Sequence, residues 1–278
     1  MSYAAGSTAV VTGAAGGIGA AIAARLVAEG FQVVVADLDP SVTQVADALG
    51  EQVTPFAGDC ATEAGVTALV AAAHEALGKV DIFFANAGVE GGKGLESTEA
   101  EWATALEVNV MAHVRAARAL VPGWLERGHG RLVVTASAAG LLTMLGSAPY
   151  SVTKHGAVAF AEWLRATYSH RGIVVQAICP QGVNTRMLDG SGPLKDLLSH
   201  DRALEPSEVA DTVWAALQSD SFLVLPHPQV ADYYRARATD PDRWLGGMGR
   251  LQAKLDTALG AAEATTEPFT EATTEETV

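Results

Sequence analysis

The stretch that decides the fold is residues 8–19, which read Thr8-Ala9-Val10-Val11-Thr12-Gly13-Ala14-Ala15-Gly16-Gly17-Ile18-Gly19. Its first five residues are an apolar, β-branched run that is typical of a buried strand. The glycines allow a tight turn, and the Ala-rich residues that follow predict a helix that ends at Gly30. A glycine-rich turn between a strand and a helix N-terminus is typical of sites that bind the diphosphate of a dinucleotide.

The same alternation continues along the chain. Further strands are predicted at 32–36, 52–56, 80–85, 132–136, 173–179 and 222–225, with helical stretches between them that include 101–127 and 149–170. Strands this apolar predict a parallel sheet that is buried on both faces. We therefore expect an α/β fold, a doubly wound (Rossmann-type) parallel sheet of about seven strands with helices on both faces. Ligands bind such sheets beyond the carboxyl ends of the strands, so the residues directly after each strand carry the functional information.

Asp37 ends the second predicted strand, at the distance from the glycine loop that suits a ribose ligand. A carboxylate there accepts hydrogen bonds from both ribose hydroxyls of NAD and repels the 2′-phosphate of NADP. Leu38 follows where an arginine could otherwise bind that phosphate, and Gly16 offers no basic side chain. We predict NAD as the cofactor; the alternative is that Asp37 caps the helix after Pro40.

A second group of polar residues follows the later strands. Ser137 comes after the fifth strand, and Tyr150 and Lys154 stand four positions apart, which places them on one helix face. A free tyrosine has a pKa near 10, and a nearby ammonium stabilises its phenolate. We therefore expect Lys154, helped by the positive charge of a bound nicotinamide ring, to lower the pKa of Tyr150, which is then the general base in oxidation and the general acid in reduction. Taken singly, Ser137 could be a turn serine, the Tyr–Lys pair a helix face, and Asn109 a core amide.

In this order and spacing, over residues 6–225, the sequence resembles the short-chain dehydrogenase/reductase family, in its form of about 250 residues. Gly13 to Gly19 matches TGxxxGxG, Asn86-Ala87-Gly88 matches the NAG element, and Tyr150 to Lys154 matches YxxxK. The resemblance implies that Ser137, Tyr150, Lys154 and Asn109 are catalytic, with Asn109 holding a water in a proton relay. It also implies cofactor contacts from the following residues: Gly13, Gly17, Ile18, Gly19, Asp37, Leu38, Asp59, Cys60, Asn86, Ala87, Gly88, Tyr150, Lys154, Pro180, Val183 and Thr185.

The substrate side is predicted from loops that vary within such folds. They are residues 88–95 with Glu90, residues 139–149 with Leu142, and residues 186–204 with Arg186 and several leucines. Gln181 replaces a glycine of the family's PGxVxT pattern, so it either contacts substrate beside Ser137 and Tyr150 or is tolerated in the turn. Because these loops are mostly apolar, we expect a largely apolar secondary alcohol or ketone as substrate. A 3-hydroxyacyl or sugar dehydrogenase, or a dinucleotide-sensing regulator without enzymatic activity, are the alternatives.

Composition limits the other possibilities. The 278 residues carry 18 basic and 32 acidic side chains, a net charge of −14, which argues against nucleic acid and anionic membranes as partners. The two cysteines and scattered histidines predict no metal site. We expect a cytoplasmic homodimer or homotetramer.

Residues 1–225 are predicted as the dinucleotide-binding and catalytic domain, 226–260 as an appended helical segment broken near Asp240-Pro241, and 261–278 as a disordered acidic tail. The appended segment could cover the substrate, contact another subunit or pack on its own domain.

Overall fold

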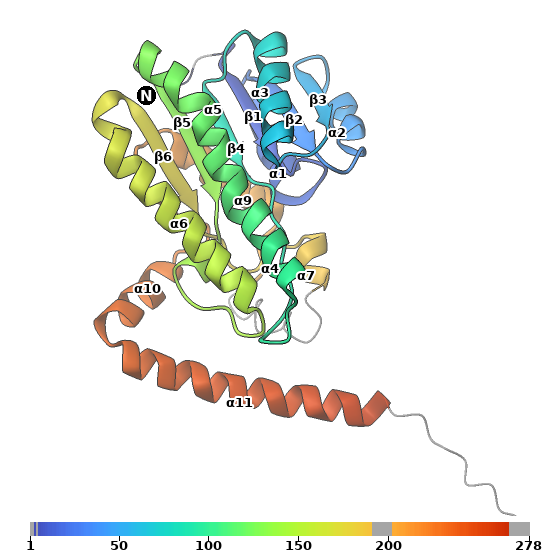
Figure 1. The fold of residues 1–278 in the computed structure, drawn as a ribbon, viewed down its shortest axis with the longest axis vertical. Helices are drawn as coiled ribbons and strands as arrows, with labels where there is room; N and C mark the ends of the chain where they lie inside the picture. The colour runs from blue at the N-terminus through green and yellow to red at the C-terminus, as the bar shows by residue number, and fades with distance from the viewer. Residues whose placement is uncertain (1–2, 4, 191–201, 267–278) are drawn as a thin grey trace, which may run out of the picture. The chain divides into compact units, whose positions relative to one another are not determined.

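The sheet has seven parallel strands in the order β3-β2-β1-β4-β5-β6-β7 (Figure 1). The computed structural model describes residues 3, 5–190 and 202–266. The order reverses between β1 and β4, and Val10 of β1 lies beside both Val34 of β2 and Phe83 of β4. The predicted fold class is therefore confirmed. The strands are β1 (Thr8–Thr12), β2 (Gln32–Asp37), β3 (Val53–Ala57), β4 (Ile82–Ala85), β5 (Gly130–Thr135), β6 (Ile173–Ile178) and β7 (Leu223–Val224).

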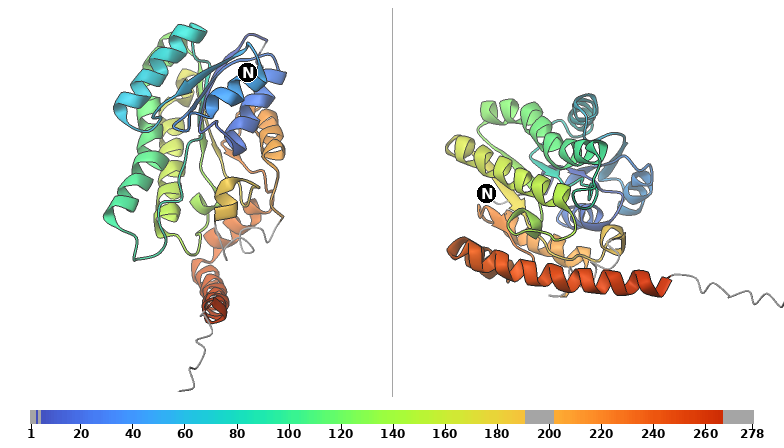
Figure 2. Two further views of the ribbon diagram at one scale, coloured as in Figure 1. Left: turned by 90° about the vertical axis from the view of Figure 1, so that its right-hand side faces the viewer. Right: turned by 60° about the horizontal axis from the view of Figure 1, so that its bottom comes forward.

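Helices cover both faces of the sheet (Figure 2). On one face α1 packs against α9, and on the other α3 packs against α5 and α4 against α6. The helices of this part of the chain are α1 (Gly17–Ala28), α2 (Val42–Leu49), α3 (Glu63–Leu77), α4 (Glu99–Leu106), α5 (Ala112–Arg127), α6 (Ala148–Tyr168), α7 (Arg186–Gly190) and α9 (Pro206–Leu217). Short 3₁₀ turns, η2 (Ala138–Gly140) and η3 (Ser169–Arg171), follow β5 and α6.

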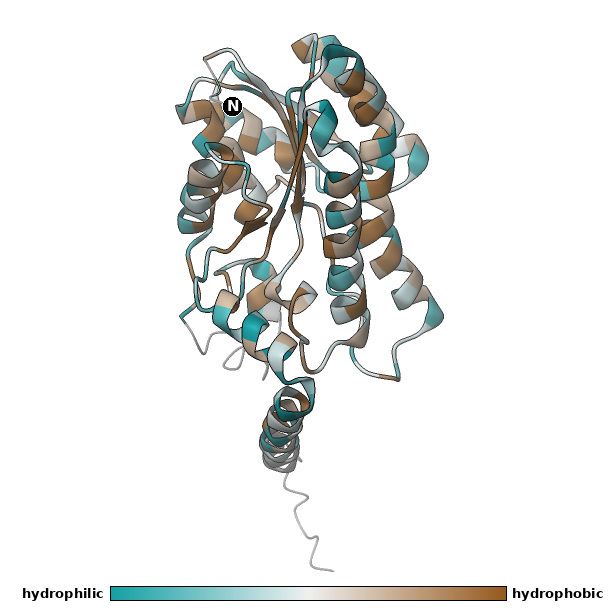
Figure 3. Ribbon diagram, turned by 90° about the vertical axis from the view of Figure 1, so that its left-hand side faces the viewer, coloured by the Kyte–Doolittle hydropathy of each residue, from teal (hydrophilic) through white to brown (hydrophobic). Residues whose placement is uncertain are grey.

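The strands of the sheet consist largely of hydrophobic residues (Figure 3), and the core lies between the sheet and its helices. Phe31, Val33, Val35 and Phe84 are fully buried. The prediction that every strand is buried on both faces is wrong for β3, in which Thr54 and its neighbour Pro55 are exposed. This strand is the edge of the sheet, where a proline is tolerated because no further strand needs its missing N–H.

The predicted helix over 101–127 is interrupted. It begins as α4, passes through a π-helical turn, η1 (Glu107–Met111), and continues as α5. Such turns hold an extra residue in one helical repeat and often occur at functional sites. Apolar periodicity does not reveal this turn, because the helix axis continues on both sides of it. Asn109 stands in the middle of η1.

The C-terminal part contains α10 (Val230–Thr239) and α11 (Pro241–Thr266). The break at Asp240 agrees with the expected interruption near Asp240-Pro241. The chain divides into two compact units, residues 1–235 and 236–278. Helix α11 extends to Thr266 instead of ending near residue 260, because the Ala-rich residues after 260 favour helix. The rest of the predicted tail, 267–278, lies outside the described residues.

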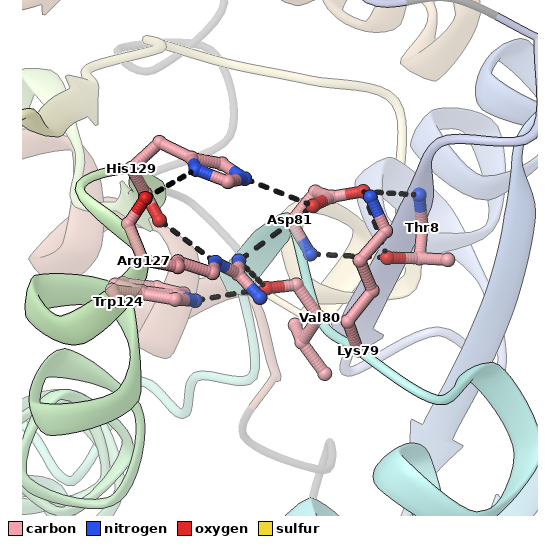
Figure 4. A network of polar contacts seen from close by, with 7 residues as sticks. All are labelled: Thr8, Lys79, Val80, Asp81, Trp124, Arg127 and His129. Atoms are coloured by element: carbon pink, nitrogen blue, oxygen red, sulfur yellow. Dashed lines mark hydrogen bonds and ion pairs between the residues drawn. The ribbon is translucent and has the colours of Figure 1, made fainter.

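A polar network joins β1, β4 and β5 at their amino-terminal ends (Figure 4). The buried Asp81 accepts hydrogen bonds at 3.1 Å from the backbone N–H and the hydroxyl of Thr8, and pairs with Lys79 at 3.1 Å and Arg127 at 3.6 Å. Burial acts to raise the pKa of Asp81, but the hydrogen bonds from Lys79 and Thr8 outweigh it and hold that pKa below its usual range. The carboxylate therefore stays charged in the interior at neutral pH.

Within the described part of the chain, no helix is long and apolar enough to cross a bilayer.

Candidate active site

Most of the residues predicted for the site follow six neighbouring strands, at the carboxyl ends of those strands. Since parallel strands present their carboxyl ends together, the glycine loop after β1 lies near Asp37, Asn86 and Ser137, which end or follow β2, β4 and β5. The topological reversal between β1 and β4 falls at this edge. Doubly wound proteins bind their ligands at this place in the fold.

The glycine loop is closely packed. Gly13 and Gly17 have positive φ angles of 65° and 55°. A Cβ on Gly19 would lie 2.2 Å from the carbonyl oxygen of Gly13, so α1 could not approach the loop with a larger residue there. Gly16 precedes α1 and has no side chain that could cap the helix. The N–H groups of the first turn, near Ile18, therefore have no capping side chain that would compete with a ligand for them. This loop fits the diphosphate of a dinucleotide.

Asp37 is held against the glycine loop. Its carboxylate accepts hydrogen bonds from the N–H of Ala15 at 2.9 Å and from the N–H of Asp39 at 3.0 Å. Asp39, not Asp37, accepts from the N–H of Ser41 at the start of α2. The geometry thus contradicts the alternative in which Asp37 caps this helix. Leu38 beside it is 75% exposed.

The loop after β4 is tied to the glycine loop by Thr12, which sequence reasoning did not count as a site residue. The Thr12 hydroxyl accepts from the N–H groups of Asn86 at 2.9 Å and Ala87 at 3.0 Å, and donates to a β4 carbonyl at 3.2 Å. The Asn86 amide in turn donates to the carbonyl oxygen of Thr12 at 2.9 Å. A Cβ on Gly88 would be 3.2 Å from the Asn109 amide oxygen and 3.3 Å from the ammonium of Lys154. Gly88 therefore allows the loop after β4 to pass close to both groups.

Asp59 and Cys60 follow β3. Asp59 accepts from the hydroxyl of Thr62 and the N–H of Ala61, both at 2.7 Å, and the hydrogen bond from Thr62 is the largest influence that lowers its pKa. Burial, followed by the charges of Asp37 and Asp59, raises the pKa of the Cys60 thiol to about 12. Cys60 is therefore a neutral apolar contact and not a nucleophile.

Ser137, Tyr150 and Lys154 come together as predicted from β5 and α6. The Ser137 hydroxyl accepts from the N–H of Ala139 at 3.1 Å, and it stands close enough to Tyr150 to act on the pKa of that phenol. The ammonium of Lys154 donates to the carbonyl oxygen of Thr135 at 2.9 Å and lies 5.5 Å from the centre of the Tyr150 ring. This arrangement places a phenol between a hydroxyl and a cation, as general acid–base chemistry requires.

The lowering of the Tyr150 pKa that we expect from Lys154 together with a bound nicotinamide ring is not found in the chain alone. Burial raises the pKa of Tyr150, and this outweighs the hydrogen bond from Ser137, which lowers it. Burial also lowers the pKa of Lys154 to about 8. Helical spacing alone does not show that both groups lose their hydration, which penalises phenolate and ammonium alike. Tyr150 is therefore a neutral phenol at neutral pH.

Asn109 is buried and joins the loop after β4 to α6. Its amide oxygen accepts from the N–H of Val89 at 2.9 Å, and its amide nitrogen donates to Val89 at 2.8 Å and to the hydroxyl of Thr153 at 3.0 Å. Thr153 is a second supporting residue that the sequence reasoning missed, because it stands unremarked inside the YxxxK motif. Its contact fixes α6 beside the π-helical turn.

His113 was also missed. It lies on α5, one turn after Asn109, and both ring nitrogens are buried without a hydrogen-bond partner among the described residues. Burial, followed by the charge of Lys154, lowers the pKa of His113 to about 3. The imidazole is therefore neutral.

The turn after β6 completes the site. The carbonyl oxygen of Pro180 accepts from Ala138 at 2.8 Å and from the hydroxyl of Ser137 at 3.4 Å. The Gln181 N–H donates to the ring of the buried His227 at 3.2 Å, and the amide oxygen of Gln181 is buried without a partner among the described residues.

The residues beyond this turn return to the glycine loop. Thr185 donates to the carbonyl oxygen of Val183 at 3.2 Å, and its methyl group lies 3.1 Å from a Cβ position on Gly17. Leu142 is buried. The predicted substrate leucines at 194, 197 and 198 lie outside the described residues.

Comparison with known proteins agrees with this geometry. A family model described as short chain dehydrogenase matches residues 7–194. A 1-deoxy-11-beta-hydroxypentalenate dehydrogenase of Streptomyces exfoliatus is 39% identical over 77% of this chain and 80% of its own length. An uncharacterized NAD-dependent oxidoreductase of Mycobacterium tuberculosis is 34% identical over 70% of this chain and 78% of its own. A short chain dehydrogenase/reductase from Burkholderia phymatum in complex with NAD is 30% identical, with a TM-score of 0.79 over 87% of this chain and 96% of that one. The chain belongs to the short-chain dehydrogenase/reductase family.

Proposed function

We propose that this chain interconverts a largely apolar secondary alcohol and its ketone, with Ser137, Tyr150 and Lys154 as its proton-transfer site. The chain is an oxidoreductase of its family, and its cofactor is NAD(H). The observation that carries the proposal is the meeting of these three side chains at the strand edge that also bears the glycine loop and Asp37.

The residues divide the work by their chemistry. The glycine loop and Asp37 would hold NAD(H), which would supply the hydride acceptor for the carbinol carbon in oxidation and the hydride donor for the carbonyl carbon in reduction. The Tyr150 hydroxyl gives a proton to the substrate oxygen in reduction and takes it back in oxidation. The Ser137 hydroxyl holds that oxygen in place. Lys154 supplies positive charge beside the phenol, and Asn109 maintains the spacing of the Val89 loop and α6.

The pKa directions favour reduction at neutral pH. Because burial raises the pKa of Tyr150, the phenol keeps the proton that a ketone must receive. Alcohol oxidation needs the phenolate, whose fraction grows as the pH rises toward the pKa. We therefore expect the oxidation rate to increase on the alkaline side of neutrality, while the reduction rate stays level until the pH approaches the raised pKa of Tyr150.

An uncharged substrate suits the site better than an anionic one. The carboxylate of Glu90 acts on Tyr150 and is among the charges that raise its pKa. Its loop is fixed to the start of α6, since the carbonyl oxygens of Gly92 and Lys93 accept from Ser147 and Ala148 at 2.9 and 2.8 Å. A substrate carboxylate near Tyr150 would meet this negative charge. Buried Leu142 and the Gln181 amide remain our proposed substrate contacts.

The test is a screen of secondary alcohols and ketones with NAD(H) and NADP(H), followed by NADH absorbance. It should include hydroxy acids with their methyl esters, 3-hydroxyacyl thioesters and sugars, so that the alternatives are tested together. We expect turnover of apolar ketones with NADH, and the esters to exceed the acids. Tyr150→Phe should lower kcat by roughly 10²–10⁴-fold, and Tyr168→Phe, on the same helix, should leave it unchanged. Retained turnover in Tyr150→Phe would refute the proposed site.

We also propose that α6 forms a contact between identical subunits in a cytoplasmic homodimer or homotetramer. Val152 and Trp163 on this helix are 52% and 57% exposed, and Phe160 stacks on Trp163 with ring centres 6.3 Å apart. Large apolar side chains exposed together are typical of interfaces. Light scattering of the purified chain and of Trp163→Glu measures this, and a monomeric wild type would refute it.

A further inference from the structure

Arg186 lies against the glycine loop, although its position in the sequence places it with the substrate-side segment. One guanidinium nitrogen is 3.3 Å from the position that a Cβ on Gly16 would occupy. Another is 3.8 Å from the carboxylate of Asp39. Thr185 beside it covers Gly17 in the same way. A cation from α7 therefore stands where Gly16 itself offers none.

The visible contact of this side chain explains little about its placement. The Arg186 side chain is 79% exposed, and its ion pair with Asp39 is long. Exposed pairs of this kind contribute little to stability, because water screens the charges and two flexible side chains must be ordered. The fold thus gains little from the guanidinium at this point.

The charges around the glycine loop indicate a role for the guanidinium of Arg186. The first turn of α1 attracts anions through its free N–H groups and the partial positive charge of the helix end. However, the carboxylate of Asp37 is bonded to this loop at Ala15, and the carboxylate of Asp39 lies 3.8 Å from the Arg186 guanidinium. A diphosphate bound there would meet these negative charges without a compensating side chain from residues 13–19, none of which is basic. Arg186 is the guanidinium that the structure places beside this loop.

We propose that Arg186 binds the diphosphate of NAD(H) through charge-assisted hydrogen bonds. The inference rests on the proposed NAD-dependent function and adds one specific residue to it. A basic side chain of residue 16 itself would suit a 2′-phosphate, but the Arg186 guanidinium reaches Gly16 from α7 and lies directly before the first turn of α1, where the diphosphate is expected. Asp37, the carboxylate that would repel a 2′-phosphate, is bonded to Ala15 on the same loop.

Calorimetric binding of NADH, ADP-ribose and NADPH to wild type, Arg186→Ala and Arg186→Lys tests this without turnover. ADP-ribose retains the diphosphate and lacks the nicotinamide. We expect Arg186→Ala to weaken NADH and ADP-ribose equally, by about tenfold, and to reduce the salt dependence of both Kd values. Arg186→Lys should recover part of the loss. Arg202→Ala, which removes an exposed arginine paired with Glu208, is the matched control and should change nothing.

The outcomes separate the two proposals. Unchanged ADP-ribose affinity in Arg186→Ala overturns the role of Arg186 and leaves the NAD site intact. A loss confined to NADPH also overturns it, because the guanidinium would then serve a 2′-phosphate. If wild type binds neither NADH nor ADP-ribose, the NAD-dependent function itself fails, and this inference with it. The melting temperature of each variant, expected to equal that of wild type, establishes that the binding is measured on folded protein.

Discussion

Replacing Lys154 with methionine should make the unliganded chain more stable at neutral pH while it abolishes turnover. Lys154 is 3% exposed, and its ammonium is held by the carbonyl oxygen of Thr135 at 2.9 Å. Burial lowers the pKa of this side chain to about 8 from its ordinary value of 10.5. The folded state therefore retains a charge that its interior disfavours. Methionine has a similar length and carries no charge to hydrate.

The magnitude follows from the pKa. A shift of this size corresponds to roughly 3 kcal/mol of unfavourable free energy in the folded state. The variant loses the hydrogen bond to Thr135, which costs it about 1–1.5 kcal/mol of stability. The net gain is then about 1–2 kcal/mol, or roughly 2–6 °C in Tm for a chain of this size.

The stability difference between the variant and wild type depends on pH. Below about pH 8 the folded wild type keeps the buried charge, so the cost is fully present. Between pH 8 and 10.5 the unfolded chain binds more protons than the folded one, and the wild type gains stability as the pH rises. The advantage of Lys154→Met should therefore shrink over this range.

Differential scanning calorimetry of wild type and Lys154→Met at pH 7, 8 and 10, without cofactor, measures this difference. Lys254→Met, which alters an exposed lysine, is the control and should show no pH-dependent difference. A variant less stable than wild type at pH 7, or an advantage independent of pH, would refute the reasoning.

Three further substitutions test other parts of the molecule. Asp37→Ala, alone and with Leu38→Arg, should shift the ratio of kcat/KM from NAD toward NADP, and each tenfold change equals about 1.4 kcal/mol; an unmoved ratio would contradict the ribose contact. His113→Leu should raise the free energy of unfolding by about 1–2 kcal/mol, because it removes two unpartnered buried nitrogens; a loss in urea denaturation would mean that the imidazole has a partner. Asp81→Asn should cost about 1–3 kcal/mol at pH 7. That cost should diminish as the pH falls through the lowered pKa of the carboxyl, so equal costs at pH 7 and pH 3 would contradict its charged state.

The fold and the polar side chains at the carboxyl ends of its strands could be predicted from the sequence because both depend on local patterns. Each strand is a short apolar run, and each site residue directly follows a strand or lies at fixed helical spacing. Ser137, Tyr150 and Lys154 therefore needed no tertiary information. The strand edge on which they meet follows from parallel pairing alone.

The supporting residues could not be found in this way, because their partners are distant in sequence. Thr12 binds the N–H groups of Asn86 and Ala87, and Thr8 binds Asp81, across more than seventy residues. A threonine that ends a strand looks the same whether or not its hydroxyl holds another loop. Arg186 is a similar case, since nothing in its neighbourhood along the chain indicates that it returns to Gly16.

The pKa values of Tyr150 and Lys154 could not be predicted from the spacing of these residues. Placing Lys154 four residues after Tyr150 does bring a cation to within 5.5 Å of the ring centre. The same packing buries Lys154 and half-buries Tyr150, and this loss of hydration opposes the two charges that the pair would need. In the chain alone the balance favours a neutral phenol and an ammonium that gives up its proton near pH 8. Under the proposed function, this proton on Tyr150 would pass to a carbonyl oxygen, and alcohol oxidation would need an alkaline medium or additional positive charge beside Tyr150 to remove it.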